Sequence, residues 1–400
     1  MPSAALERAA RHIFSLGVPD LATDLCLANT TIGLAKTHFV QEALGLPAEA
    51  LFIGGPDMTV TRNLARWEAG FAYGGKFDWT GPEPLIVLQV KPNVCGMLVA
   101  GVESVPPPEV LAERVERLQR KPGSLEGVPL DFDLARSNHF ANLYTSPPDS
   151  SLPPYLLVLH GAAPELRADN RFGWGLYWDE SPALMEAARH FDTPWGALDV
   201  LLGEAVEKYY RTHQHAERFA AERRLLFARA LFGEFEVISN ELHQGLTSPG
   251  EMYLGCHPIP SPAVSAAGQE EAREGVLLPF MVDRDVPAYL LRGLPNLTPT
   301  QMAALGWRER AEELGVGECL QRANLLAHGS GYAVGGPAEI VLRESPAPAA
   351  VLLQRGDQET ANPREMVDGY RGEEVLRHLL ELGLGEVAYR LEFHQTVIAP

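Results

Sequence analysis

Short runs of consecutive apolar residues along the chain predict β-strands. Several of these runs, such as YLLVLHG, are apolar almost without interruption, so both faces of the corresponding strands should be buried. The predicted strands cover residues 84–90, 95–102, 155–161, 275–282, 338–344, 349–356 and 387–393.

Apolar residues that recur at steps of three and four predict helices, most strongly over residues 198–232. Residues 5–17 are typical of an ordinary first helix and not of a signal peptide. The remaining predicted helices cover residues 107–120, 300–314 and 373–382. The order of strands, long helices and strands again predicts an α+β fold, a single domain over residues 1–400 with outer helices around central mixed sheets.

The composition is typical of a globular protein with a substantial core. Hydrophobic residues make up 46% of the 400 residues and charged residues 21%. No run of about 18 apolar residues occurs, so we expect no membrane span. Four scattered cysteines without a C-x-x-C pair argue against a disulfide framework and a zinc ribbon, and they predict a cytoplasmic location.

The formal net charge is -19, from 33 Lys and Arg against 52 Asp and Glu. Such a chain should repel nucleic acid at long range. If it binds a polyanion, it needs a local basic surface or bound cations.

Histidines and one cysteine stand at the ends of predicted elements. His160 ends the strand YLLVLHG, His328 ends ANLLAHG, and Cys95 begins CGMLVAG. His139 lies in SNHF, and His243 follows the strand-like EFEVIS. Strand ends present side chains to clefts, and imidazoles with a thiolate are the ligands of zinc, manganese or iron.

Each of these residues also has a structural interpretation. A buried cysteine is most often a small hydrophobe, and a histidine at a strand end is most often a hydrogen-bonded core residue. The segment HGSGYAVGG can be a glycine turn, since it lacks the dinucleotide fingerprint, and the chain has no Walker A sequence.

Read in order, these residues resemble the RtcB family of RNA ligases, which join an RNA 3′-phosphate or 2′,3′-cyclic phosphate end to a 5′-hydroxyl end with GTP and manganese. The family motifs are D-x-x-C-G, G-N-H-F, a strand-end H-S-G-S, an H-N pair, H-G-A-G-R and a tyrosine-lysine pair. The matching segments are Pro92-Asn93-Val94-Cys95-Gly96, Ser137-Asn138-His139-Phe140, His160-Gly161, His243-Gln244, His328-Gly329-Ser330-Gly331-Tyr332 and Tyr370-Arg371. The resemblance is clearest over residues 80–400 and implies an RtcB-like fold around a metal cleft.

The resemblance also implies a role for each matched residue. Cys95 would be a thiolate shared by two metal ions, His139 and His160 would complete one site, and His243 would hold the second ion. His328 would be the nucleophile that takes up GMP. The implied nucleotide contacts are Asn138, Gly329, Ser330, Gly331, Tyr370 and Arg371. A thiolate with imidazoles suits Mn²⁺, or Zn²⁺, better than Mg²⁺.

The chain departs from the family at several motif positions. Pro92 replaces a metal-binding aspartate, so we expect one tight metal site and a weak second site. Residues 279–291 replace a serine-rich nucleotide segment, and residues 257–259 (His-Pro-Ile) replace an arginine-lysine pair. Tyr332 and Arg371 replace an arginine and a lysine.

The sequence therefore predicts a GTP- and Mn²⁺-dependent RNA ligase-like enzyme with RNA as its partner. One alternative is a metal-dependent phosphoesterase or nucleotidyl transferase on the same scaffold. Another is a non-catalytic protein that binds a metal or a nucleotide. Retention of His328 favours the two enzymes, whereas the lost basic residues favour the two alternatives.

Overall fold

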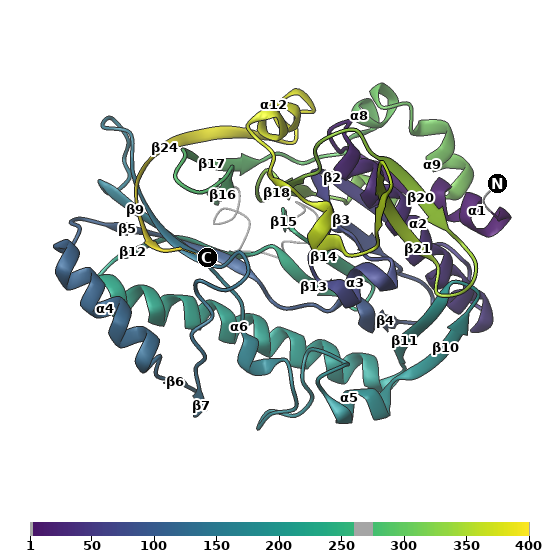
Figure 1. Ribbon diagram of the computed structural model, residues 1–400, viewed down its shortest axis with the longest axis horizontal. Helices are drawn as coiled ribbons and strands as arrows, with labels where there is room; N and C mark the ends of the chain where they lie inside the picture. The colour runs from purple at the N-terminus through teal and green to yellow at the C-terminus, as the bar shows by residue number, and fades with distance from the viewer. Residues whose placement is uncertain (1–2, 260–274, 400) are drawn as a thin grey trace.

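The computed structural model describes residues 3–259 and 275–399, which form an α+β fold with several sheets (Figure 1). The α+β class predicted from the sequence is confirmed. Within the described part of the chain, no helix combines the length and the apolar character that a membrane crossing needs.

The largest sheet has seven strands and is antiparallel throughout. Its strand order is β12 (Glu236–Leu242), β5 (Gly96–Val102), β9 (Tyr155–Gly161), β8 (Phe140–Thr145), β24 (Gly385–Ile398), β17 (Ala288–Gly293) and β16 (Leu278–Met281). All of β5 and nearly all of β9 are buried, as the continuous apolar runs predict.

Helix α6 (Glu204–Phe232) covers one face of this sheet, with α4 (Pro108–Arg120) packed against it (Figure 1). Phe219 and Phe227 of α6 join Leu98, Leu157 and Leu159 of the sheet in one buried cluster. This packing holds α6 against β5 and β9, the strands at whose ends Cys95 and His160 lie.

A second sheet of five strands is mixed, because β1 runs parallel to β2 while its other pairs are antiparallel. Its order is β1 (Ile13–Ser15), β2 (Leu51–Thr59), β3 (Tyr73–Asp78), β14 (Glu251–Leu254) and β13 (Gln244–Ser248). The expected mixed character therefore holds for this sheet and is wrong for the larger one.

The other sheets in the described part of the chain are small. Two have three strands, β10 (Arg189–Thr193), β11 (Gly196–Leu202) and β4 (Leu85–Val87), and β20 (Glu339–Arg343), β21 (Ala350–Arg355) and β22 (Gln358–Thr360). Three are pairs, β15 (Cys256–Pro258) with β18 (Leu325–Ala327), β19 (Tyr332–Ala333) with β23 (Gly369–Tyr370), and β6 (Ser124–Leu125) with β7 (Val128–Pro129). The remaining α-helices of residues 3–259 and 275–399 are α1 (Ala4–Arg11), α2 (Leu21–Ala43), α3 (Leu64–Ala69), α5 (Pro182–Ala187), α8 (Pro299–Ala304), α9 (Arg308–Leu314), α10 (Gly317–Gln321), α11 (Pro363–Met366) and α12 (Glu374–Glu381).

Several predicted boundaries are wrong for local reasons. The helix expected over 198–232 begins only at Glu204, because residues 198–202 pair as strand β11 and Gly203 has a left-handed backbone. The helix expected over 300–314 is split into α8 and α9 around Gly306, which is also left-handed. The expected first helix ends at Arg11, and the residues after it form β1.

Helix α2 was not predicted, and it is not an outer helix. It contacts β2, β11 and β21, strands of three different sheets, and most of its side chains are buried. A helix that is buried nearly all round carries no one-sided apolar stripe, so its sequence lacks the signal on which helix prediction depends.

Candidate metal centre and adjoining pocket

Cys95, His139 and His160 come together because three neighbouring strands end at one place. Cys95 directly precedes β5, His139 directly precedes β8, and β9 lies between them with His160 near its end. Cys95 Sγ lies 2.9 Å from His160 Nε2 and 3.5 Å from His139 Nε2. All three side chains are buried. The antiparallel register thus converts distant sequence positions into a Cys-His-His cluster that can hold a metal ion.

The atoms that face each other fit a metal ion. Metal–sulfur and metal–nitrogen bonds of about 2.3 and 2.0–2.1 Å at a tetrahedral angle separate the two ligand atoms by about 3.5 Å. The Cys95–His139 distance of 3.5 Å already has this value, and the Cys95–His160 distance of 2.9 Å would have to widen by a few tenths of an ångström. The donor types and their spacing therefore suit a zinc or manganese ion.

His243 and His328 extend the cluster. His243 follows β12, and its Nε2 lies 3.2 Å from His160 Nε2. The His243 ring is stacked on the His328 ring, with centroids 4.5 Å apart and an interplanar angle of 26°. His328 directly follows β18. All five residues that the sequence singled out thus lie in one contiguous group, and His243 joins its two halves.

Asp57 of β2 holds His328 in place. Its Oδ2 accepts from the His328 backbone N–H at 3.2 Å and lies 2.9 Å from His328 Nδ1. The Asp57 side chain is fully buried. With Nδ1–H donating to this carboxylate, the lone pair of His328 is on Nε2. Tyr73 packs edge-on against the His328 ring at 5.7 Å and donates its hydroxyl hydrogen to Gln244 Oε1 at 3.3 Å.

The glycines after His328 allow close backbone approach. Gly331 has φ of +70°, and a Cβ there would lie 2.7 Å from the Asp57 carbonyl oxygen. A Cβ on Gly329 would lie 2.7 Å from the Met281 carbonyl oxygen. These glycines therefore let the H-G-S-G segment lie between β2 and β16.

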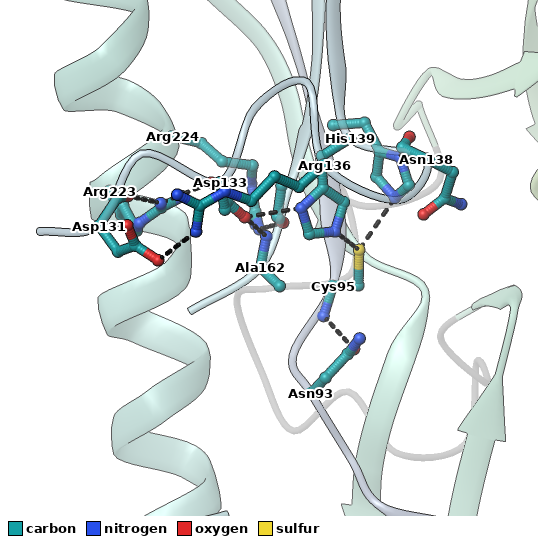
Figure 2. Close-up of polar contacts among 12 residues, drawn as sticks. Asn93, Cys95, Asp131, Asp133, Arg136, Asn138, His139, Ala162, Arg223 and Arg224 are labelled. Carbon is teal, nitrogen blue, oxygen red and sulfur yellow. Dashed lines mark hydrogen bonds and ion pairs between the residues drawn. The ribbon is translucent and has the colours of Figure 1, made fainter. Parts of the chain in front are cut away.

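The loop that presents Cys95 is shaped by its own residues. Lys91 and Val94 both have left-handed backbone, with φ of 47° and 53°. Asn93 Oδ1 accepts from the Cys95 backbone N–H at 2.9 Å (Figure 2). Pro92 lies in this loop and offers no ligand atom, as the sequence indicated.

The electrostatics of the cluster favour a thiolate beside an imidazolium when no metal is bound. Burial alone would raise the pKa of the Cys95 thiol, but positive charge on His160 and His139 holds it well below its usual range. Burial opposes charge on His139, yet the Cys95 thiolate and Asp133 raise its pKa to about 10. Burial lowers the pKa of His243 well below its usual value. A metal ion would replace the proton on His139 Nε2.

A pocket opens over His328. Five of the six expected nucleotide contacts line it, namely Asn138, Gly329, Ser330, Gly331 and Tyr370. The hydroxyl of Ser330 donates to the Val282 carbonyl oxygen, and the Asn138 carbonyl oxygen lies 2.8 Å from His160 Nδ1. The pocket lies against the metal cluster, because His160 also lines it.

Arg371, the sixth expected contact, is not among the residues that line the pocket. Its guanidinium is 2.6–2.7 Å from both carboxylate oxygens of Asp20, and it also donates to the Met58 carbonyl oxygen and to Thr23 Oγ1. Arg371 is only 4% exposed. Its donors are therefore committed to holding α2 and β2 together.

The pocket continues into an outer part of about 570 Å³, which shares Asp283, Arg284, Tyr332 and Tyr370 with the inner part. The rings of Tyr332 and Tyr370 are stacked with centroids 4.9 Å apart. The Arg62 guanidinium lies over the Tyr332 ring, 5.7 Å from its centroid. Tyr332 thus covers one face of Tyr370, and both residues line the pocket.

The outer part is locally basic. Arg62, Arg284 and Arg364 line it with exposed side chains, and within residues 3–259 and 275–399 none of the three pairs with a carboxylate. Asp283 and Asp285 also line it, so the five charged side chains carry a net charge of +1. A chain of net charge -19 therefore carries a small positive area at the entrance to this site.

The sequence analysis missed two acids that support the histidines. Asp57 lies in LFIGGPDMT, where a single acid in an otherwise apolar strand is a recognisable signal. Asp133 lies 2.6 Å from His139 Nδ1 through its Oδ2, and nothing in its sequence context distinguishes it from a surface acid. His257 was noted only as a departure, yet its buried ring packs at right angles to His243, 5.7 Å away.

Neither protein-family models nor curated proteins match this chain.

Proposed function

We propose that this protein is an RtcB-like ligase that joins an RNA 3′-phosphate or 2′,3′-cyclic phosphate end to a 5′-hydroxyl end, using GTP and Mn²⁺. One observation carries the proposal. A histidine whose Nδ1 is held by a buried carboxylate lies at a pocket that borders a Cys-His-His cluster. The pairing of an oriented imidazole with a metal site is what nucleotidyl transfer to histidine requires.

His328 is the proposed nucleophile. Its Nε2 lone pair attacks the α-phosphorus of GTP, an N–P bond forms, the bond to the bridging oxygen breaks, and pyrophosphate leaves. Asp57 stabilises the positive charge that the imidazole gains. The imidazole then returns as the leaving group when GMP passes to the RNA 3′-phosphate, and a 2′,3′-cyclic phosphate must first be opened by water to that form. The 5′-hydroxyl attacks the activated 3′-phosphorus, a phosphodiester bond forms, and GMP leaves.

Cys95, His139 and His160 are the proposed ligands of one tightly bound Mn²⁺, or Zn²⁺. When bound, such an ion neutralises charge on phosphate oxygens. We propose that His243 contributes to a second ion, and because Pro92 offers that ion no carboxylate, the second site should be weak.

The basic entrance supports a phosphate-bearing substrate. Arginines form bidentate contacts with phosphate, and three of them line the outer part of the pocket. They supply the local positive surface that a chain of charge -19 needs before it can accept RNA.

The experiment mixes the purified protein with α-labelled GTP and Mn²⁺ and looks for an acid-labile protein adduct. The expected result is one labelled chain that loses its label in acid and passes GMP to RNA with a 3′-phosphate. His394→Ala, at an exposed histidine outside the pocket, is the matched control and should label normally. No adduct in the wild-type protein rejects the proposal.

A metal-dependent phosphoesterase is the second candidate. The observation that favours it is the loss of nucleotide-binding capacity at two positions, because Arg371 is committed to Asp20 and Tyr332 covers one face of Tyr370. This enzyme would hydrolyse a 2′,3′-cyclic phosphate with metal alone. Release of product without GTP, and no labelled adduct, would support it over ligation.

A further inference from the structure

Asp133 contacts the candidate ligand His139, and its two carboxylate oxygens have different partners. Oδ2 pairs with His139 Nδ1 at 2.6 Å, and Oδ1 accepts from Arg223 Nη2 at 2.5 Å. Figure 2 shows Asp133 between His139 and Arg223. Both Asp133 and Arg223 are buried, at 4% and 0% exposure, so the pair is shielded from water.

Arg223 is itself fixed by a second acid. Its Nε donates to Glu165 Oε1 at 2.9 Å, and its Nη2 also donates to the Asp131 carbonyl oxygen. A planar guanidinium with several engaged donors has little freedom to move. The position of the Asp133 carboxylate is therefore determined by helix α6, on which Arg223 lies.

Arg224, the next residue of α6, supports the strand that carries His160. Its Nη1 donates to the Gly161 carbonyl oxygen at 3.1 Å, and its Nε donates to Asn240 Oδ1 at 2.7 Å. A Cβ on Gly96 would lie 2.8 Å from Arg224 Nη2, so this guanidinium packs directly under the residue after Cys95. Arg223 thus contacts the carboxylate that pairs with His139. Arg224 contacts Gly161 and Gly96, the residues that follow His160 and Cys95 in the chain.

The chemical consequence concerns His139. A carboxylate at Nδ1 fixes the ring orientation and the tautomer, so that Nε2 presents its lone pair on the side of Cys95. Without that carboxylate the ring can rotate, and the Nε2–Sγ separation of 3.5 Å is no longer enforced.

We propose that Asp133, held by Arg223 of α6, is a positioning residue of the metal centre that sets both the affinity and the geometry of the bound ion. This inference rests on the metal-binding part of the proposed function and on none of its nucleotide chemistry. It assigns to α6 a role in metal retention although the helix contributes no ligand.

The test titrates the full-length protein with Co²⁺ alone. Cobalt bound to Cys95 gives a thiolate-to-metal charge-transfer band, and its d–d bands report the coordination geometry. Asp133→Asn keeps the shape but cannot satisfy both His139 and Arg223, and the Co²⁺ affinity should fall about 10- to 100-fold with altered d–d bands. The matched control is Asp131→Asn in the same loop. The Asp131 side chain forms an exposed ion pair with Arg136 at 2.9 Å, so this variant should bind Co²⁺ as the wild type does.

A second variant guards against a folding defect, since Asp133→Asn removes a buried charge beside Arg223. Asp133→Glu keeps that charge and shifts the oxygen that faces His139, so folded protein should still show weaker binding and shifted d–d bands. Wild-type affinity and spectrum in either folded variant overturn the proposal, and so does a wild-type chain that binds no Co²⁺. Normal Co²⁺ binding without guanylation rejects the nucleotide chemistry alone and leaves Asp133 to be judged by its own variants.

Discussion

Replacing Asp57 by asparagine tests the proposed role of Asp57 in orienting His328 as a nucleophile. Asp57 Oδ2 lies 2.9 Å from His328 Nδ1 and 3.2 Å from its backbone nitrogen, and the carboxylate is fully buried. Asparagine has the same shape, but it carries no charge and can present an N–H group to Nδ1. That arrangement would favour the tautomer whose Nε2 bears a proton and cannot attack phosphorus.

The expected size of the effect follows from this contact. A hydrogen bond to a charged group contributes about 1.5–3 kcal/mol, and each 1.36 kcal/mol of barrier is about tenfold in rate. Guanylation by the Asp57→Asn protein should therefore be about 10- to 150-fold slower if the full contribution acts in the transition state.

The assay measures the initial rate of label incorporation from α-labelled GTP at saturating Mn²⁺. Asp192→Asn is the matched control, because the side chain of Asp192 is 94% exposed and does not line the pocket. Metal content should stay unchanged, since Asp57 is not among the three ligands. Guanylation at the wild-type rate would refute the orienting role, and loss of metal would refute the separation of nucleophile from metal site.

Three further outcomes are expected. His328→Ala should abolish guanylation and keep the metal, whereas His139→Ala should lose both, as measured by labelling and metal analysis; metal loss in His328→Ala would contradict the nucleophile assignment. Metal analysis of the wild-type protein should find about one chelator-resistant divalent ion per chain, because three ligands enclose one ion. In the metal-free protein, the pKa of Cys95 is lowered from 9.0 and that of His139 is raised from 6.5 to about 10, so the folded pair holds one proton, on His139. In the unfolded chain the same two residues hold two protons below pH 6.5, one between pH 6.5 and 9, and none above pH 9. The contribution of the pair to stability should therefore be constant between pH 6.5 and 9 and fall on both sides; thermal unfolding with a chelator checks this, and Cys95→Ser should remove the loss on the acid side.

The strands that carry the candidate ligands could be predicted from the sequence because they are buried on both faces. The continuous apolar runs marked β5 and β9, and their ends marked Cys95 and His160. The convergence of the candidate ligands could not be predicted from such local patterns. It depends on strand order, with β9 between β5 and β8, and no local pattern encodes that order. Only the succession of motifs indicated it.

The supporting acids and the innermost helix could not be found in the same way. Asp57 contacts His328, which lies 271 positions later in the chain, so only the fold brings the two together. Asp133 precedes His139 by 6 positions, but no sequence pattern shows that the loop between them turns the carboxylate toward the ring. Helix α2 is buried nearly all round and lacks a periodic stripe. The over-long helix of 198–232 has the opposite cause, since the apolar residues of β11 happen to continue the spacing of α6.

The stacking of His243 on His328 links the positions of the two rings. Nε2 of His243 lies 3.2 Å from His160, and the same ring lies face to face with His328. A ring is rigid, so any pull on that nitrogen by an ion turns the surface against which His328 rests. The proposed metal site and the proposed nucleophile therefore share one ring, and a substitution that moves His243 to suit a different ion should also shift His328.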